Sequence, residues 1–497
     1  MRKENIGLAP SVIVSQKHLL IIAFMFISGA LASLLLLPSP LNLIPFIIVG
    51  GAAFVILSIK YSVIGIFIYM ILYFVRPQEL FPNVAIFSYP YEKIVGIIVI
   101  ANLVLDFAIN GRMIKIFKMD KAVVGIIGVA LVSIATALWV GWSWMNFQKF
   151  LKIVLVYFFL SRLVDTPGKF KWIVWLYIVS TAFIAISSTV NYYTGHFQTT
   201  MGIQRAVGMG EGAYADPNTM ATTLVLGLPF MFYVARAYRS KLIKVFLWSL
   251  LFVCLWTVII TGSRGGMLGS AFTLFLLAWN SRKKVIATVT VALLIFGALA
   301  VMPEQYAQRL TTITHIGDAY DESGAAESAQ GRIKGLKVGF EILSRRPIAG
   351  VGIGCFSVYN HQNHGSSLNA HNLLGQVMGE LGILGLGAFA FLIYMIFKHI
   401  KYIKSQYRSR GWAGDVNYYV AVAVMIATIS MLFQGIFGHI AYRFNWYIYA
   451  CFLAIIMNLV GDRIRGEDES KARVLSPLPG NGASAGRGLL PPGNHVE

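Results

Sequence analysis

The sequence predicts an all-α fold, a polytopic bundle of about 12 to 14 transmembrane helices. Two compositional values support this: 57% of the 497 residues are hydrophobic, and only 12% are charged. Soluble domains carry about 25% charged residues, so this chain has too little charge to coat several water-facing domains. The third observation is a series of apolar runs that are long enough to cross a bilayer. Together they exclude a soluble enzyme.

Apolar runs of roughly 15 to 25 residues recur along almost the whole chain. The first has no small-residue cleavage site after it, so we expect a retained helix and not a removed signal peptide. The third and sixth are short, which leaves the count open between about 12 and 14. The predicted helices cover 18–37, 41–59, 61–75, 92–109, 122–141, 147–162, 172–190, 219–236, 242–260, 264–281, 285–302, 372–397, 417–437 and 441–460.

The net charge of +20 is interpreted as a topology signal. Basic residues cluster in alternate short loops, as the positive-inside rule expects of cytoplasmic loops. The main clusters lie at 112–121, 236–244, 282–284 and 398–410. We therefore expect a multi-pass membrane protein with both termini in the cytoplasm, and no nucleic-acid partner is needed to explain the charge.

The chain divides into four predicted regions. Residues 1–302 form an N-terminal transmembrane bundle, 303–371 one long extracytoplasmic loop, and 372–465 the C-terminal transmembrane helices. Residues 466–497, rich in Gly, Pro, Ser and charge, are expected to be a disordered cytoplasmic tail. Long ordered loops are usually functional, so the outer side is where chemistry is expected.

The long loop contains an amphipathic pattern. Ile333, Leu336, Phe340 and Leu343 fall on one helical stripe, and Pro347 predicts that the helix stops after Arg345 and Arg346. The helix would lie on the outer membrane surface or cap the bundle. The alternative is that its stripe packs on the loop's own core.

Three polar stretches lead into helices that run inward from the outer side. Asp216 is predicted as an N-cap before Pro217, and Ser263 and Asn369 as caps of the other two helices. Helix N-termini carry unpaired N–H groups and partial positive charge, so with Arg205 and Arg264 they would form an anion site. The stretches are 205–208 with 216–218, then 261–266, and finally 369–372 followed by Glu380-Leu381-Gly382.

Each of these stretches also has a purely structural interpretation. The glycines around Ser263 and Arg264 would permit a tight turn and close helix packing, with Arg264 reaching the membrane interface. Arg205 alone is typical of an interfacial arginine. Lys149 and Lys152, near the outer end of a predicted helix, would either reach outward into water or hold a lipid phosphate.

His371 is the best-matched general base on the outer side, because an unperturbed histidine has a pKa near 6.5. His361 and His364 are competitors, and the three show no metal-ligand spacing. Glu380, two and a half turns further on, points away from His371 and is interpreted as a structural partner. The glycines at 350–354 resemble part of a nucleotide-binding loop, but a backbone turn fits them better.

Residues 200 to 400 resemble the O-antigen ligase and polymerase superfamily of bacterial envelope glycosyltransferases. The similarity rests on Arg205, on the turn at 263–266, on Arg332 and Pro347, on the run Gly350, Gly352, Gly354 and Phe356, and on His371-Asn372 with Glu380-Leu381-Gly382. Aromatic residues that often accompany the loop arginine are missing around Arg332, and about two helices are additional.

The resemblance implies a metal-independent transferase with no cofactor. It would move a glycan from undecaprenyl pyrophosphate to an acceptor hydroxyl of lipid A core, a growing polysaccharide or a protein, on the periplasmic face. Arg205 and Arg264 would hold the pyrophosphate, and His371 would activate the acceptor. Further substrate contacts would come from Ser263, Gly265, Lys149, Lys152, Arg332 and Asn372, with Asp216 and Glu380 in structural roles.

Two other classes of function remain open from the sequence. A transporter or lipid-linked glycan flippase would fit the many helices and a few buried charges such as Glu380, although no internal repeat is evident. A noncatalytic scaffold for envelope polymer assembly would need no anion pocket. In every case membrane lipids surround the protein.

Overall fold

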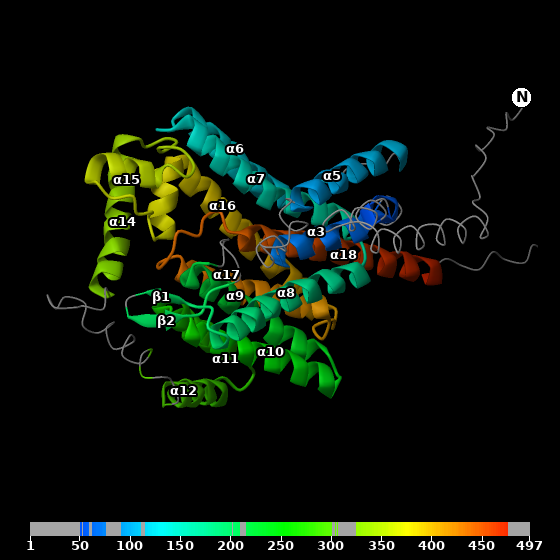
Figure 1. The fold of residues 1–497 in the computed structure, drawn as a ribbon. Helices are drawn as coiled ribbons and strands as arrows, with labels where there is room; N and C mark the ends of the chain where they lie inside the picture. Colours follow the sequence, from blue (N-terminus) through cyan, green and yellow to red (C-terminus); the bar gives the residue numbers. More distant parts are fainter. Residues whose placement is uncertain are drawn as a thin grey trace, which may run out of the picture.

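The computed structural model describes residues 50–51, 53–58, 62–75, 91–110, 115–200, 202–208, 215–300, 304, 306 and 325–475 (Figure 1). Helices dominate these residues, which confirms the all-α prediction. The elements are α3 (Ser62–Val75), α5 (Tyr91–Asn110), α6 (Asp120–Ala135), α7 (Val140–Leu163), α8 (Pro167–Tyr193), β1 (Gln198–Thr200), β2 (Ile203–Arg205), α9 (Pro217–Ala237), α10 (Lys241–Ile260), α11 (Arg264–Trp279), α12 (Lys284–Ala300), α14 (Ala325–Arg345), α15 (Phe356–His364), α16 (Leu373–Ser409), α17 (Val416–Gln434) and α18 (Phe444–Leu475).

Within the described ranges, six helices are long and apolar enough to cross a membrane, namely α8, α9, α10, α16, α17 and α18. A polytopic helical membrane bundle is therefore confirmed. The total of 12 to 14 spans stays a prediction, because the first predicted helix, 18–37, lies outside the described residues. The first ten residues of the predicted disordered tail, 466–475, are helical, because α18 continues through them. Good helix formers such as Glu467 and Lys471 stand four positions apart there, a spacing that favours a helix.

The core of the bundle lies where α8, α9 and α18 meet. Tyr177 of α8 packs edge-on against Phe230 of α9, with 4.8 Å between ring centroids, and Phe230 meets Tyr449 and Phe452 of α18. Gly227 of α9 allows the close approach of α8, since a Cβ there would lie 2.6 Å from the Thr181 side chain. This close packing holds α8, α9 and α18 in fixed positions relative to one another.

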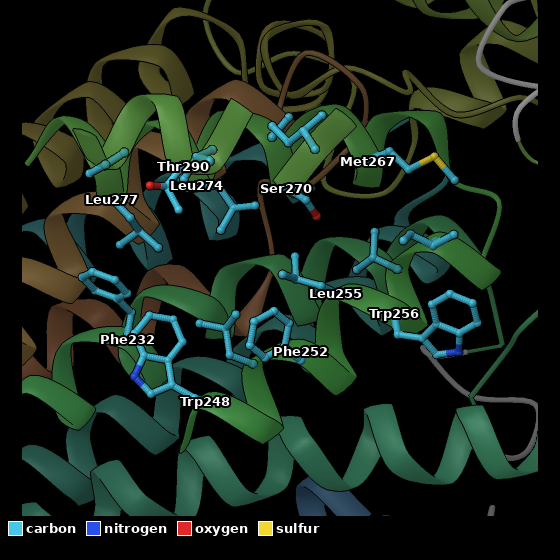
Figure 2. A pocket seen from close by; sticks show the side chains of 18 of the residues that line it. Phe232, Trp248, Phe252, Leu255, Trp256, Met267, Ser270, Leu274, Leu277 and Thr290 are labelled. Carbon is cyan, nitrogen blue, oxygen red and sulfur yellow. The ribbon is translucent and has the colours of Figure 1, made fainter. Parts of the chain in front are cut away.

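On one side of the bundle, α10, α11 and α12 enclose an apolar groove of about 760 Å³ (Figure 2). Its walls include Phe252 and Leu255 of α10, Leu274 of α11 and Val291 of α12. The groove follows the length of α11, and the N-terminus of α11 belongs to the polar stretches described below.

α16 is broken at Gly382, which has φ 63° and ψ −154°. The segment that follows α14 replaces the lost helical hydrogen bonds. The N–H groups of Ile383 and Leu384 donate to the carbonyls of Pro347 (2.8 Å) and Ile348 (3.2 Å). In the opposite direction, Val351 donates to the carbonyl of Gly379 at 2.9 Å. Irregular backbone in a spanning helix is tolerated where protein satisfies it in this way.

The same segment is tied to the corner between α6 and α7. Leu138 donates its N–H to the carbonyl of Val351 at 3.0 Å, and the Trp142 indole donates to the carbonyl of Gly354 at 2.9 Å. Gly352 and Gly354 have positive φ angles, and a Cβ at either would lie 2.5 Å from a neighbouring side chain. The glycine run is thus a backbone turn, as predicted, and it packs the outer loop onto the bundle.

α14 crosses the N-terminal end of α16, and Figure 1 shows it standing roughly across the ends of the long helices. Gly335 and Gly339 allow the contact, since a Cβ at Gly339 would lie 2.5 Å from the carbonyl oxygen of Gly375. The predicted apolar stripe faces elsewhere: Ile333 is 56% exposed and Phe340 65% exposed. The alternative in which this stripe packs on the loop's own core is therefore wrong for the described residues.

Candidate functional site

Three capped helix N-termini lie at the end of the bundle where α14 crosses. Asp216 caps α9, accepting the N–H groups of Asn218 (3.2 Å) and Thr219 (3.1 Å). Ser263 caps α11, accepting the N–H of Gly266 at 3.2 Å. The prediction that Asn369 caps the third helix is wrong by about one turn. Asn372 caps α16 and accepts the N–H of Gly375 at 3.0 Å.

Arg205 joins the first two N-termini. Its Nε donates to the carbonyl of Thr261 at 2.7 Å, and its Nη2 donates to Asn218 Oδ1 at 3.1 Å. The same Asn218 oxygen accepts a hydrogen bond from Ser263 Oγ at 2.8 Å. The Arg205 side chain is only 5% exposed, so its guanidinium is held in place between α9 and α11.

A short hairpin of β1 and β2, absent from the all-α prediction, presents Arg205. The strands pair antiparallel, with Gln198 opposite Arg205, and Gly202 with φ 74° lies in the turn. Tyr306 donates its hydroxyl to the carbonyl of Gln204 at 2.8 Å, and Ala206 donates its N–H to the carbonyl of Ile260 at 2.9 Å. The bond from Ala206 fastens the hairpin to the end of α10, and the bond from Tyr306 holds its second strand.

Arg264 and Arg332 bring two more guanidinium groups to this end. Arg264 is 9% exposed at the first position of α11. The pKa of Arg332 is lowered, mainly because Arg332 is buried and also because the positive charge of Arg264 is nearby. Arg332 donates to the carbonyl of Phe437 at 3.4 Å and lies 5.6 Å from the centre of its ring. Two neighbouring cations repel each other, and an anion bound between them would offset that cost.

His371 stands directly before the cap of α16. It is the only non-glycine residue with positive φ, 45°, among the described residues. Such a conformation is uncommon and often marks a functional position. Burial lowers the pKa of His371 below 6.5, Arg332 lowers it further, and Asp216 opposes them. His371 is therefore mainly neutral at pH 7, and its charge neighbours come from α9 and α14.

The connection between α17 and α18 completes this end of the bundle. Asn372 donates its side-chain N–H to the carbonyl of Ile436 at 3.4 Å, and Leu373 donates its backbone N–H to Gly435 at 2.7 Å. Arg443 donates to the carbonyl of Thr219 at 3.0 Å. The connection thus ties α16 to α9.

His439 of that connection lies beside His371, with 5.3 Å between ring centroids and 75° between ring planes. Burial, His371 and Arg443 lower the pKa of His439 to about 4. Sequence analysis missed His439, Arg443 and the bridging role of Asn218. The signal for His439 was the short break at 438–440 between two predicted apolar runs, and Arg443 is a lone basic residue near the start of the second run.

Of the remaining predicted residues, Gly265 lies at the site, and Lys149, Lys152 and Glu380 lie away from it. Gly265 faces Phe437, and a Cβ there would lie 3.2 Å from the Phe437 side chain. Lys149 and Lys152 are exposed on α7, where Lys149 lies 5.9 Å from the Trp142 ring, and no described contact joins them to His371. Glu380 is 3% exposed and accepts a hydrogen bond from the Tyr442 hydroxyl at 2.7 Å.

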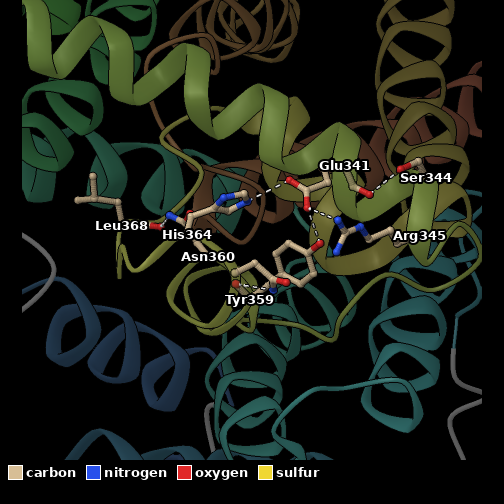
Figure 3. Close-up of polar contacts among 8 residues, drawn as sticks. Glu341, Ser344, Arg345, Tyr359, Asn360, His364 and Leu368 are labelled. Carbon is tan, nitrogen blue, oxygen red and sulfur yellow. Dashed lines mark hydrogen bonds and ion pairs between the residues drawn. The ribbon is translucent and has the colours of Figure 1, made fainter.

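The two competing histidines lie away from this site. His364 belongs to a separate polar cluster on α14 and α15 (Figure 3), and His361 lies on α15 close to that cluster in the chain. His364 contacts the Glu341 carboxylate at 3.0 Å, and Tyr359 donates to it at 2.8 Å. His361 contacts Ser367 at 3.2 Å. Neither has a described contact with the three capped N-termini, so of the three candidate histidines His371 alone is placed with the arginines.

The fold and the site define a multi-pass membrane protein with a cationic, histidine-containing site at one end of its bundle. Residues 249–390 match the family model described as O-antigen ligase. The match covers less than a third of the chain. It supports the predicted resemblance to the O-antigen ligase and polymerase superfamily, a class of membrane glycosyltransferase-type enzymes. The match includes Ser263, Arg264, Arg332 and His371, and Arg205 precedes it. Comparison with curated proteins found no match.

Proposed function

We propose that the protein transfers a glycan from undecaprenyl pyrophosphate to an acceptor hydroxyl at the periplasmic face of the bacterial inner membrane. One observation carries the proposal: three capped helix N-termini, the guanidinium groups of Arg205, Arg264 and Arg332, and the neutral imidazole of His371 gather at one end of the bundle. Both termini would then lie in the cytoplasm.

The arginines and helix ends would hold the pyrophosphate of the donor. As the bond between the anomeric carbon and the pyrophosphate oxygen breaks, negative charge grows on the leaving group. Groups already fixed in place stabilise that charge without reorganising. Arg205 is fixed by Thr261 and Asn218, and Ser263 shares the same Asn218 oxygen, so donors from α9 and α11 are arranged before substrate binds.

His371 would remove the proton of the acceptor hydroxyl. The acceptor oxygen forms the new bond to the anomeric carbon, its proton passes to the imidazole, and undecaprenyl pyrophosphate leaves with the electron pair of the broken bond. A base must be neutral to act, and burial and Arg332 lower the pKa of His371 in that direction. General base catalysis typically contributes about 10²- to 10⁴-fold.

The other proposed residues would support these two roles. Arg332 and Asn372 would contact substrate beside His371, and Ser263 and Gly265 would do so at the start of α11. Lys149 and Lys152, exposed on α7, would attract lipid phosphate from further away. Asp216 and Glu380 hold helix ends: Asp216 through its cap, and Glu380 through its bond with Tyr442.

The test is transfer from purified lipid-linked donor by the full-length protein in detergent or nanodiscs. Arg205→Ala, Arg264→Ala and His371→Ala are each expected to lower kcat/KM by about 10²-fold or more. Arg345→Ala is the matched control, because this arginine of α14 is 61% exposed in its side chain and forms an ion pair with Glu341, in the polar cluster of α14 and α15. Full activity in all three site variants would overturn the proposal.

A transporter or flippase is the second candidate, and the break of α16 at Gly382 near Glu380 favours it. Broken helices often form substrate sites in transporters. Here, however, the backbone of Pro347, Ile348 and Val351 fills the break with hydrogen bonds. Translocation of lipid-linked glycan in proteoliposomes, without formation of a glycan product, would support this candidate over transfer.

A further inference from the structure

The apolar groove between α10, α11 and α12 leads away from the proposed pyrophosphate site. Figure 2 shows Met267 and Trp256 at one end and Phe232, Trp248 and Leu277 at the other. The Met267 end is one helical turn from the cap of α11, since the Met267 N–H donates to the Ser263 carbonyl at 2.9 Å. From Met267 to Leu277 the groove runs about 15 Å along α11.

The second wall of the groove reaches the site as well. Ile259 of α10 lines the groove, and Thr261, two residues later, provides the carbonyl that accepts from Arg205. Both long walls therefore end at residues that hold the cationic site. A molecule whose charged head lies at Arg205 and Arg264 would have the next part of its chain at Met267 and Ile259.

The chemistry of the walls selects a hydrocarbon. The described lining residues are apolar apart from the hydroxyls of Ser270, Ser281 and Thr290, and none of them is charged. The volume of about 760 Å³ lies within the range of about 300 to 1,000 Å³ common for ligand sites. The groove is also open along one side, because Phe252 is 54% exposed and Leu268 37% exposed. A long chain can therefore enter from the bilayer without threading.

We propose that this groove holds the first isoprene units of the donor's polyprenyl chain while the pyrophosphate lies at the capped N-termini. The inference rests on the proposed function, because it takes the donor to be lipid-linked. It commits to the polyprenyl chain over a bilayer acyl chain, since the donor's chain ends in a pyrophosphate, whose greater negative charge suits several guanidinium groups better than the single phosphate of a bilayer lipid. The groove would make the start of α11 the meeting point of head and tail.

The groove's main effect would be orientation. Bilayer lipid is as apolar as the groove, so little hydrophobic free energy is gained when the chain moves between them. What changes is the number of directions in which the chain can leave the pyrophosphate, and restricting them fixes the anomeric carbon relative to His371. Chain length and shape would therefore affect kcat/KM of transfer even though the reaction occurs at the head.

The first test measures binding without catalysis. Undecaprenyl pyrophosphate carrying a photoreactive diazirine in its early isoprene units is crosslinked to the full-length protein in phosphatidylglycerol nanodiscs, and the adducts are mapped by mass spectrometry. We expect adducts on groove residues such as Phe252, Leu255 and Leu274, suppressed by unlabelled undecaprenyl pyrophosphate. Adducts spread over lipid-facing residues such as Val245, or suppressed equally by added phosphatidylglycerol, would show an ordinary acyl-chain surface and overturn the inference.

The second test compares two substitutions on one helix. Leu274→Trp fills the groove, and Leu276→Trp is the matched control, since both leucines are half-buried on α11 but only Leu274 lines the groove. We expect Leu274→Trp to lower groove crosslinking and kcat/KM for the undecaprenyl-linked donor about tenfold, with little change for a geranyl-linked donor. Equal losses on both donors, or equal effects of both substitutions, would contradict the groove assignment.

A third variant keeps the proposal testable if Leu274→Trp does not fold. If Leu274→Trp fails to give a monodisperse protein, Leu274→Ala widens the groove and is expected to weaken crosslinking at Leu255 and chain-length preference in the same direction. The two proposals fail separately. Groove crosslinking with no transfer by wild-type protein would count against the proposed function alone, and transfer without groove crosslinking would count against the groove alone.

Discussion

The imidazole rings of His371 and His439 meet at 75° with 5.3 Å between their centroids, although 68 positions separate them in the chain. The pKa values of both are lowered, so both are mainly neutral at pH 7. A protonated imidazole beside a second cation would be disfavoured. His371 thus helps to keep His439 neutral, while burial and Arg332 keep His371 in the form that accepts a proton.

The pH dependence of transfer should depend on Arg332, because the positive charge of Arg332 lowers the pKa of His371. Burial and Arg332 lower the pKa of His371, so kcat/KM of the wild type is expected to fall only at a pH below 6.5. Arg332→Ala removes one lowering influence, and the midpoint of the acid limb is expected to move to higher pH. The measurement is kcat/KM from pH 5 to 8. Lys334→Ala, an exposed change on the same helix, should leave the midpoint in place; a midpoint that stays fixed in Arg332→Ala would contradict the electrostatic link.

Asn218 should position Arg205 through its oxygen. Its Oδ1 accepts from both Arg205 and Ser263, so Asn218→Ala removes one acceptor shared by two donors. We expect kcat/KM to fall by about tenfold, as loss of a hydrogen bond to a charged group suggests. Asn218→Asp keeps the acceptor and should recover part of the activity. If Asp and Ala were equally impaired, the oxygen would not be what matters; Gln198→Ala, exposed on β1, is the control.

Gly382 should be intolerant of any side chain. Its φ and ψ lie in a region nearly restricted to glycine, and a Cβ would lie 2.5 Å from the Ile348 carbonyl oxygen. Gly382→Ala is expected to destabilise the folded protein by about 1 to 3 kcal/mol, measured as a lower Tm in detergent. Gly387→Ala on the same helix, where a Cβ meets nothing within 4 Å, should leave Tm unchanged or raise it. Equal Tm values for the two variants would refute the role of the break.

The exposed stripe of α14 should contact the membrane surface. Phe340 is 65% exposed beside Ile333, and Lys334 and Lys337 are exposed on the same helix. Tryptophan fluorescence of Phe340→Trp, corrected for the native tryptophans, is expected to shift to shorter wavelength in bilayers and to be quenched by brominated lipids. Lys334→Trp, exposed about 100° around α14 from Ile333 and off the apolar stripe, should be quenched less. Equal quenching at both positions would rule out a preferred lipid-facing stripe.

Local chemistry made several elements predictable. Asp216 before Pro217 and Ser263 before the glycines were identified as caps because capping depends on three or four adjacent residues. Pro347 predicted that the helix stops after Arg345 and Arg346, and α14 ends at Arg345, within one residue of that prediction. The glycine run after it was identified as a turn for the same reason.

Features set by partners distant in the chain were not predictable in this way. The packed face of α14 is made by Gly335 and Gly339, which hydropathy does not mark as a contact surface. Asn372, not Asn369, caps α16 because Leu373 and Asn372 are also bonded to the connection before α18. The neighbour of His371, His439, lies on that connection, and no spacing rule relates the two.

The break at Gly382 has a consequence for how such a protein diversifies. Leu373–Leu381 is separated from the long inner part of α16, and its tilt is held by the segment from Pro347 to Gly352. Substitutions in that segment would change the tilt of this short N-terminal piece, and with it the position of His371, without altering the long part of α16 after Gly382. For the proposed transferase, acceptor choice would then depend on a few residues of the loop and not on the helices of the bundle.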